Sequence, residues 1–122
     1  MNKPVFLVLL FGLSSFAMAR TAFAHAELVT AVPAADATVR PAPTELDLTF
    51  SDQIEIKFTG VTVIGHDQNR VKTGTKTLKD DGRTFTVLLP ASLAAGPYKV
   101  QWHTLSADGP KTTGDYTFNV AP

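Results

Sequence analysis

The sequence contains no cysteine, and this absence excludes several classes of function at once. Without thiolates the chain can form no disulfide framework, no thiolate zinc site, no iron–sulfur cluster and no cysteine nucleophile. An excess of charge of one sign is also lacking, because 11 Lys and Arg balance 11 Asp and Glu. A balanced chain has no charge surplus with which to hold the phosphates of nucleic acid. With 122 residues, 44% of them apolar, the chain has room for one folded domain.

Residues 1–24 have the features of a secretory signal peptide. A lysine near the start is followed by an almost continuous apolar run over residues 5–17, which is too short to span a bilayer of about 30 Å as a helix. Small residues come next, and Ala22-Phe23-Ala24 matches the A-x-A pattern that precedes a cleavage point. Cleavage there makes His25 the first residue of the exported domain. The sequence therefore predicts a signal peptide at 1–24, one domain at 25–122 and a periplasmic location.

A second A-x-A pattern lies upstream, at Ala17-Met18-Ala19, and would place the cut before Arg20. We prefer the later cut because a strand-like pattern begins soon after His25 and leaves no spare tail. The later cut also removes Met1 and Met18, the two methionines of the sequence. The exported domain would then hold no sulfur, and therefore none of the soft ligands that favour Cu(I).

Short runs of alternating apolar and polar residues dominate the exported domain. Leu46, Leu48 and Phe50 share one parity, and this period of two predicts a strand with one buried face. Further strands are expected at 84–89, 98–103 and 116–120, with weaker patterns at 28–32, 54–58 and 61–64. Turn-forming residues separate these runs, and only residues 91–95 could form a helical turn. About seven short strands at this spacing predict an all-β protein with an antiparallel, Ig-like Greek-key β-sandwich.

The strand that opens at Tyr98 carries a mark of this kind of sandwich. Gly96 precedes the tyrosine by two residues, and a short Leu-Ala-Ala segment lies just upstream. This spacing suits a corner where the tyrosine hydroxyl bonds to backbone earlier in the chain. We therefore assign Tyr98 a structural role rather than a catalytic one.

Three histidines are the candidate nitrogen ligands, and cleavage gives one of them a special position. As the first residue of the exported domain, His25 would offer both its α-amine and its imidazole Nδ1 to one metal ion. Two nitrogens in one plane suit tetragonal Cu(II), which prefers nitrogen and oxygen donors. The alternative interpretation is that a terminal histidine is an accident of where the peptidase cuts.

Five motifs follow one another along the exported domain, and together they resemble one known family. The motifs are His25-Ala-Glu-Leu, Pro33-Ala-Ala-Asp36, Leu48-Thr-Phe-Ser-Asp52, Leu93-Ala-Ala-Gly96-Pro-Tyr98-Lys-Val-Gln-Trp102-His, and Ser106-Ala-Asp108-Gly109 through Gly114-Asp-Tyr-Thr-Phe118. In this order they resemble the CopC family of periplasmic copper-binding proteins, and most closely its short, methionine-free, YobA-like branch. The resemblance implies a seven-stranded β-barrel or sandwich of cupredoxin-like shape and a Cu(II) site without catalysis. It also implies a role in copper homeostasis or resistance, with a CopD-type inner-membrane protein as partner.

The same resemblance implies a set of metal ligands. The family binds Cu(II) through the terminal histidine and its amine, which here is His25, and through an Asp in the loop after the Trp-bearing strand, which here is Asp108. A carboxylate after a Phe-Ser pair, a ligand or close neighbour in some members, matches Asp52. The family's second histidine, two residues after the Asp, is replaced by Pro110. The site would therefore lack one of three nitrogens, and water or Asp52 would complete the plane.

The other two histidines are weaker candidates. His103 has the opposite parity to Trp102, so it should point away from the core, although its strand leads into the Asp108 loop. We prefer a solvated or supporting role for His103 and keep it as a candidate ligand. His66 lies in a turn-rich loop and is interpreted as a surface residue.

Two other classes of function are alternatives. The first is a metal-free exported interaction module, which would explain why Pro110 replaces the family's second histidine. A copper-bearing oxidative enzyme can also use a terminal histidine on a β-sandwich, but it needs a second imidazole and a flat substrate face. A domain this small, with its aromatic residues at core parity, offers neither. We therefore expect no enzyme activity, no nucleic-acid binding and no membrane span in the exported domain.

Overall fold

The computed structural model describes residues 25–122 of the chain. This part contains nine strands and one short 3₁₀ helix. In chain order the elements are β1 (Leu28–Val32), β2 (Thr38–Val39), β3 (Glu45–Phe50), η1 (Ile56–Phe58), β4 (Gly60–Gly65), β5 (Arg70–Val71), β6 (Lys76–Leu78), β7 (Thr84–Leu88), β8 (Gly96–Leu105) and β9 (Lys111–Val120). The predicted signal peptide at 1–24 lies outside the described residues. Within them, no helix has the length and apolar character needed to cross a membrane.

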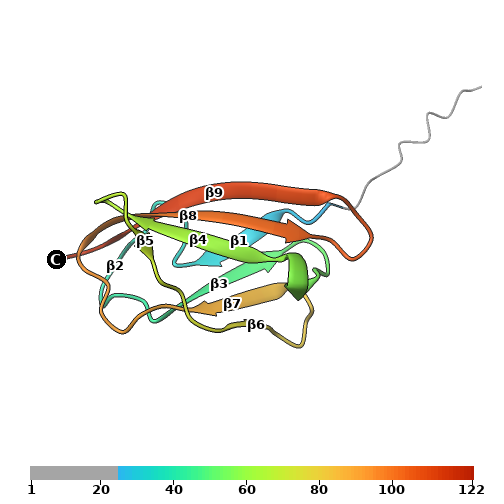
Figure 1. Cartoon of the computed structure of the whole chain (residues 1–122), viewed down its shortest axis with the longest axis horizontal. Coiled ribbons are helices and arrows are strands. Elements are labelled where there is room, and N and C mark those ends of the chain that lie inside the picture. The colour runs from blue at the N-terminus through green and yellow to red at the C-terminus, as the bar shows by residue number, and fades with distance from the viewer. Residues whose placement is uncertain (1–24) are drawn as a thin grey trace, which may run out of the picture.

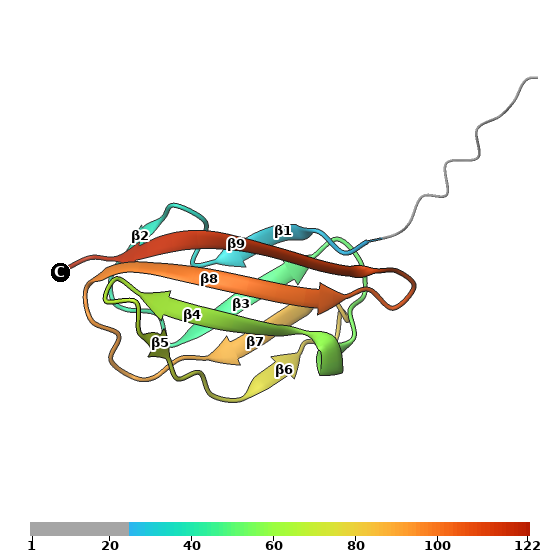
Figure 2. The same ribbon diagram turned by 45° about the horizontal axis from the view of Figure 1, so that its top comes forward.

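The strands form two sheets that face each other (Figures 1 and 2). One sheet has the strand order β1-β3-β7-β6, and the other has the order β2-β9-β8-β4-β5. Neighbouring strands run antiparallel, apart from the parallel pair of β2 and β9. The longest pairing joins β8 to β9 along the whole length of both strands, from Gly96 opposite Val120 to Leu105 opposite Lys111. The predicted all-β sandwich is confirmed.

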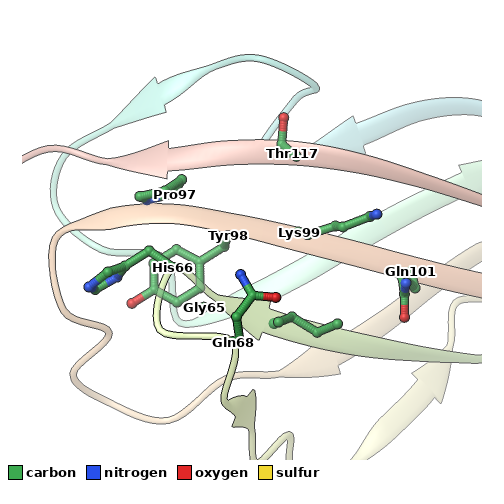
Figure 3. A pocket seen from close by; sticks show the side chains of 9 residues that line it. Gly65, His66, Gln68, Pro97, Tyr98, Lys99, Gln101 and Thr117 are labelled. Carbon is green, nitrogen blue, oxygen red and sulfur yellow. The ribbon is translucent and has the colours of Figure 1, made fainter.

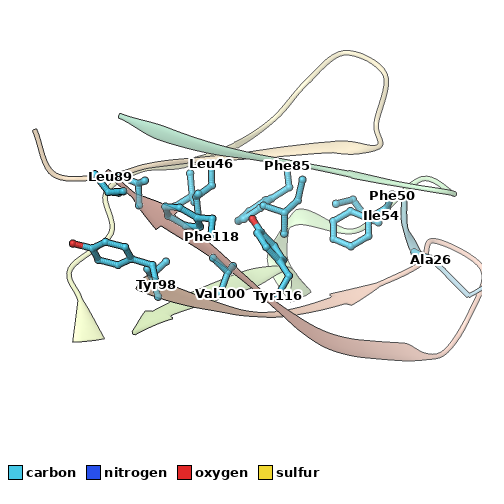
Figure 4. Packing of buried hydrophobic residues seen from close by; sticks show 14 residues of the cluster. Ala26, Leu46, Phe50, Ile54, Phe85, Leu89, Tyr98, Val100, Tyr116 and Phe118 are labelled. Atoms are coloured by element: carbon cyan, nitrogen blue, oxygen red, sulfur yellow. The ribbon is translucent and has the colours of Figure 1, made fainter. Parts of the chain in front are cut away.

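The core lies between the two sheets and follows from the alternation in the sequence (Figure 4). Leu46, Leu48 and Phe50 on β3 are almost completely buried, as their shared parity predicts. Val100 on β8 and Phe118 on β9 are buried from the other sheet. Because both sheets place apolar side chains on their inner faces, burial of these residues from water holds the two sheets together.

The central strand β7 departs from a simple alternation. Phe85 and Val87 are buried as expected, but Thr84 and Thr86 are buried as well. Neighbouring strand β3 supplies their polar partners. Thr86 donates its hydroxyl hydrogen to an oxygen of Asp47, and the hydroxyls of Thr84 and Thr49 lie 3.1 Å apart. Polar side chains of β3 therefore help to cover the outer face of β7. The alternation of residues along β7 alone could not predict this burial, because the partners come from another strand.

Two local predictions differ from the structure. The strand expected at 54–58 is wrong beyond Ile54, which makes a single bridge to Ser106, because Ile56–Phe58 form η1 instead. The helical turn considered at 91–95 does not form. The structure also contains β2, β5 and β6, which have two or three residues each and are too short to show alternation.

The tyrosine corner expected at Tyr98 is present. The Tyr98 hydroxyl donates to the carbonyl oxygen of Ala94 at 2.6 Å. Gly96 adopts a φ of +134°, a backbone conformation that residues with a Cβ rarely adopt. The Tyr98 ring stacks on Phe118 with the ring centroids 5.5 Å apart. This corner fixes the start of β8, and burial raises the pKa of the Tyr98 hydroxyl.

The Tyr98→Phe substitution should remove this hydrogen bond while leaving the stacked ring in place. We expect the free energy of unfolding to fall by about 1 kcal/mol, which urea denaturation would measure. Tyr116→Phe is a matched control, because the buried Tyr116 hydroxyl has no hydrogen-bond partner among the described residues. Loss of that hydroxyl should leave stability unchanged or raise it. Equal losses of stability in the two variants would contradict the assignment of the corner.

Candidate metal site

Residues 25–27, which precede β1, are held against the sandwich at several points. The Glu27 amide donates to Oγ of Ser51 at 2.9 Å, and the Ser51 amide donates to the Glu27 carbonyl at 2.8 Å. The Thr112 hydroxyl donates to the carbonyl of Ala26 at 2.8 Å. Ala26 itself is completely buried. The first residues of the predicted exported domain therefore have a defined place between the end of β3 and the start of β9.

Asp52 follows β3 and is tied to the loop between β8 and β9. Its Oδ2 accepts the Ser106 hydroxyl at 2.9 Å, and its Oδ1 accepts the amide of Gln53 at 2.8 Å. Ser106 is buried, and its Oγ accepts the Asp108 amide at 3.4 Å. The side chain of Asp108 is exposed. Hydrogen bonding thus runs from Asp52 through Ser106 to the backbone of Asp108.

These contacts bring three segments to one end of the sandwich: the start of the described chain, the turn after β3 and the β8–β9 loop (Figure 2). Ser51 and Asp52 are adjacent, so the residue that holds the N-terminal segment is next to the residue that holds the loop. His25, Asp52 and Asp108 therefore come from segments that the structure joins, as a shared site requires.

His25 faces a carboxylate that the ligand prediction did not include. Its Nε2 lies 3.4 Å from Oε1 of Glu27. Both side chains are largely exposed, so this ion pair adds little to the stability of the fold. The contact bears on the metal site because it engages Nε2 and leaves Nδ1 as the imidazole nitrogen that is free to bind a metal ion.

His103 lies on the outer face of the five-stranded sheet. It is exposed, and it stands opposite Gly60 on β4 and Thr113 on β9. Its ring covers Gly60 so closely that a Cβ added to the glycine would approach the ring to 2.8 Å. The predicted outward direction of His103 is confirmed. The Ser106 hydroxyl that contacts Asp52 is buried, whereas the His103 side chain lies on the solvent side of β8. His103 therefore does not face the contact between Asp52 and Ser106.

His66 lies at the far end of β4, in the turn before β5, and is exposed as expected. It helps to line an open groove of about 290 Å³ together with Gln68, Lys99 and Thr117 (Figure 3). Among the residues that line this groove, His66 is the one histidine and there is no carboxylate. The groove therefore offers a metal ion only one strong ligand.

Within residues 25–122, no three His, Asp or Glu side chains are grouped so that they could hold a metal ion. The described side chains alone do not form a complete metal site. A metal ion at this end would need a further donor, and the α-amine of a processed terminus at His25 is one. Pro110 contributes none, since its ring carries no side-chain donor.

The residues that hold this end together were missed by the sequence reasoning. Ser51, Ser106 and Thr112 anchor the segments that carry the candidate ligands, and Glu27 meets the imidazole. The only hint in the sequence is proximity, because Ser51 directly precedes Asp52 and Ser106 stands two residues before the loop aspartate. Such spacing is too common to identify an anchor.

Comparison with known proteins shows a match along nearly the whole described chain. The family model of the CopC domain matches residues 28–121. Protein YobA of Escherichia coli strain K12 is 41% identical over 99 residues, which are 80% of this chain and 80% of YobA. Copper transport protein CutJ of Bacillus subtilis is 30% identical over 102 residues, which are 83% of this chain but only 19% of CutJ.

Solved structures show the same architecture. CopC from Methylosinus trichosporium OB3b superimposes with a TM-score of 0.74 at 31% identity, covering 80% of this chain and 95% of that one. PcoC, described as a methionine-rich copper resistance protein from Escherichia coli, superimposes with a TM-score of 0.70 at 33% identity, covering 80% of this chain and 99% of that one. Since the family model spans almost all of residues 25–122, the chain belongs to the CopC family.

Proposed function

We propose that this protein binds Cu(II) where its N-terminal segment meets the β8–β9 loop, and that it serves copper homeostasis or resistance in the periplasm. The observation that carries the proposal is the set of hydrogen bonds that joins the two segments. Ser51 holds the backbone of Glu27, two residues after His25, and the adjacent Asp52 holds Ser106 and through it the Asp108 loop. Membership of the CopC family supports a copper-related function independently of this geometry.

The donor chemistry supports Cu(II) in particular. After cleavage before His25, its amine and Nδ1 would supply two nitrogens, and the exposed Asp108 carboxylate would supply an oxygen. Asp52 still has lone pairs on both oxygens and could complete the plane, as could water. Residues 25–122 contain neither cysteine nor methionine, so they hold no sulfur ligand that would favour Cu(I). The outward place of His103 supports a solvated or supporting role for that residue.

The bound ion is cargo in this proposal, and the protein buffers it or delivers it to a CopD-type inner-membrane protein. The match to CutJ supports the link to transport, because a segment similar to this chain forms about a fifth of a protein named for copper transport. The proposal includes no catalytic step. The signal peptide at 1–24 and the periplasmic location belong to the proposal as well, since the terminal amine of His25 exists only after cleavage.

The second candidate function is a metal-free exported interaction module. Pro110 favours it, because the family's second imidazole is absent there. The two candidates differ in whether the processed protein binds copper at all.

Processed protein that begins at His25 should bind one Cu(II), and a version that keeps a methionine before His25 should bind it far more weakly. The extra residue turns the His25 amine into a peptide amide and so destroys the chelate. We expect an affinity loss of at least about 100-fold, equivalent to about 2.8 kcal/mol. Electron paramagnetic resonance and a competition titration with a chelator would measure it. Trp102 is the single tryptophan, so quenching of its fluorescence gives a third measurement.

His66→Ala is the matched control for the loss of a histidine, because His66 lies at the other end of the sandwich. Its Cu(II) affinity should equal that of the unchanged protein, whereas His25→Ala should lose binding. Equal affinity with and without the extra methionine would refute the terminal chelate.

The Pro110→His substitution separates the two candidate functions. If the site binds copper as proposed, a restored imidazole beside Asp108 should raise an affinity that is already measurable, by about tenfold or more, which is about 1.4 kcal/mol. If the protein is a metal-free module, the unchanged chain should show no binding, and any binding by the variant would be newly acquired. Calorimetric titration of both processed proteins with Cu(II) decides between these results.

A further inference from the structure

Residues 25–27 are alternately exposed, buried and exposed, with their central residue turned inward. Ala26 is completely buried, and the structure assigns no helix or turn to this segment. This alternation is that of an extended chain, in which side chains point to opposite sides in turn and residues two apart share a side. His25 and Glu27 therefore both project outward on the same side. This placement accounts for the 3.4 Å between Nε2 of His25 and Oε1 of Glu27.

The backbone beneath this pair is fixed while the side chains are exposed. Ser51 makes two hydrogen bonds to the backbone of Glu27, and Thr112 makes one to the carbonyl of Ala26. The His25 and Glu27 side chains are 48% and 72% exposed. The 3.4 Å separation is also longer than the about 2.7–3.2 Å of a well-formed N–H···O hydrogen bond. The pair is thus held close by the backbone, and a small side-chain rotation would close the hydrogen bond.

We propose that Glu27 is a positioning residue that orients the imidazole of His25 for copper, an inference that rests on the proposed function. A neutral imidazole carries its hydrogen on one nitrogen and a lone pair on the other. A carboxylate at Nε2 favours the hydrogen on that nitrogen and leaves the lone pair on Nδ1. Nδ1 is the nitrogen that closes the chelate with the α-amine. A ligating histidine whose other ring nitrogen donates to a carboxylate is held in orientation and made more basic.

Asp52 is not equivalent to Glu27 in this respect. Its two oxygens already accept the Gln53 amide and the Ser106 hydroxyl, and the bond to Ser106 keeps it in contact with the β8–β9 loop. Glu27 has no comparable side-chain partner in the structure apart from the imidazole, among the contacts of residues 25–122. The two carboxylates therefore have separate tasks: Asp52 holds the loop, and Glu27 holds the ring.

The test compares Glu27→Ala, Glu27→Gln and Glu45→Ala in processed protein that begins at His25. Nitrogen-15 resonances of the imidazole in metal-free protein report which ring nitrogen carries the hydrogen, and a chelator competition reports the Cu(II) affinity. Glu27→Ala should raise the fraction with hydrogen on Nδ1 and lower the affinity about tenfold. Glu27→Gln keeps a carbonyl acceptor and should restore the tautomer and most of the affinity. Glu45, an exposed carboxylate at the other end of β3, should be replaceable without effect on either measurement.

Two results would overturn the proposal in distinguishable ways. Glu27→Ala protein with the unchanged tautomer ratio, or with the unchanged Cu(II) affinity, rejects the positioning role alone. Unsubstituted processed protein that binds no Cu(II) rejects the proposed function, and the positioning role with it. Because Glu27 is exposed and is anchored through its own backbone amide and carbonyl, the substitution should not disturb folding, and urea denaturation of each variant verifies this.

Discussion

The pairing of β8 with β9 is the constraint on which both ends of this molecule depend. It runs along the whole of both strands, from the tyrosine corner at Gly96 to the loop that carries Asp108. In a strand, a shift of one residue would move every side chain to the other face of the sheet. The buried pair of Tyr98 and Phe118 sets the register at one end. At the other end this register turns Thr112 inward, where its hydroxyl reaches Ala26.

The pattern in the sequence could predict the parts of the fold that depend on neighbouring residues along one strand. Alternation correctly predicted the buried face of β3 and the outward direction of His103. It could not predict η1, because nothing in the order of apolar residues at 54–58 shows that only Ile54 pairs with another segment. It also missed the burial of Thr86, since its partner Asp47 comes from a strand 39 residues away.

The same distinction applies to the metal site. His25 could be selected because the predicted cleavage would give it a terminal amine, and Asp108 and Asp52 because they match motifs of a family. The groups that bring them together lie far apart in sequence: the bond between Ser106 and Asp52 spans 54 residues, and the bond between Thr112 and Ala26 spans 86. Hydroxyl and backbone contacts at such separations depend on the completed sandwich. The sequence could therefore propose ligands, which stay predictions, but it could not predict the contacts that join the segments carrying them.

Pro110 gives the proposed site a particular dependence on processing. A site with two imidazoles could keep part of its affinity without the terminal amine, because side chains alone would supply two nitrogens. Here the proposed side-chain donors are one imidazole and carboxylates, and residues 25–122 contain no group of three His, Asp or Glu that could hold a metal. Under the proposed function, strong binding then requires the amine, and only the cleaved protein has it. The precursor would carry no competent site before export, so copper binding would be restricted to the periplasm by chemistry rather than by location alone.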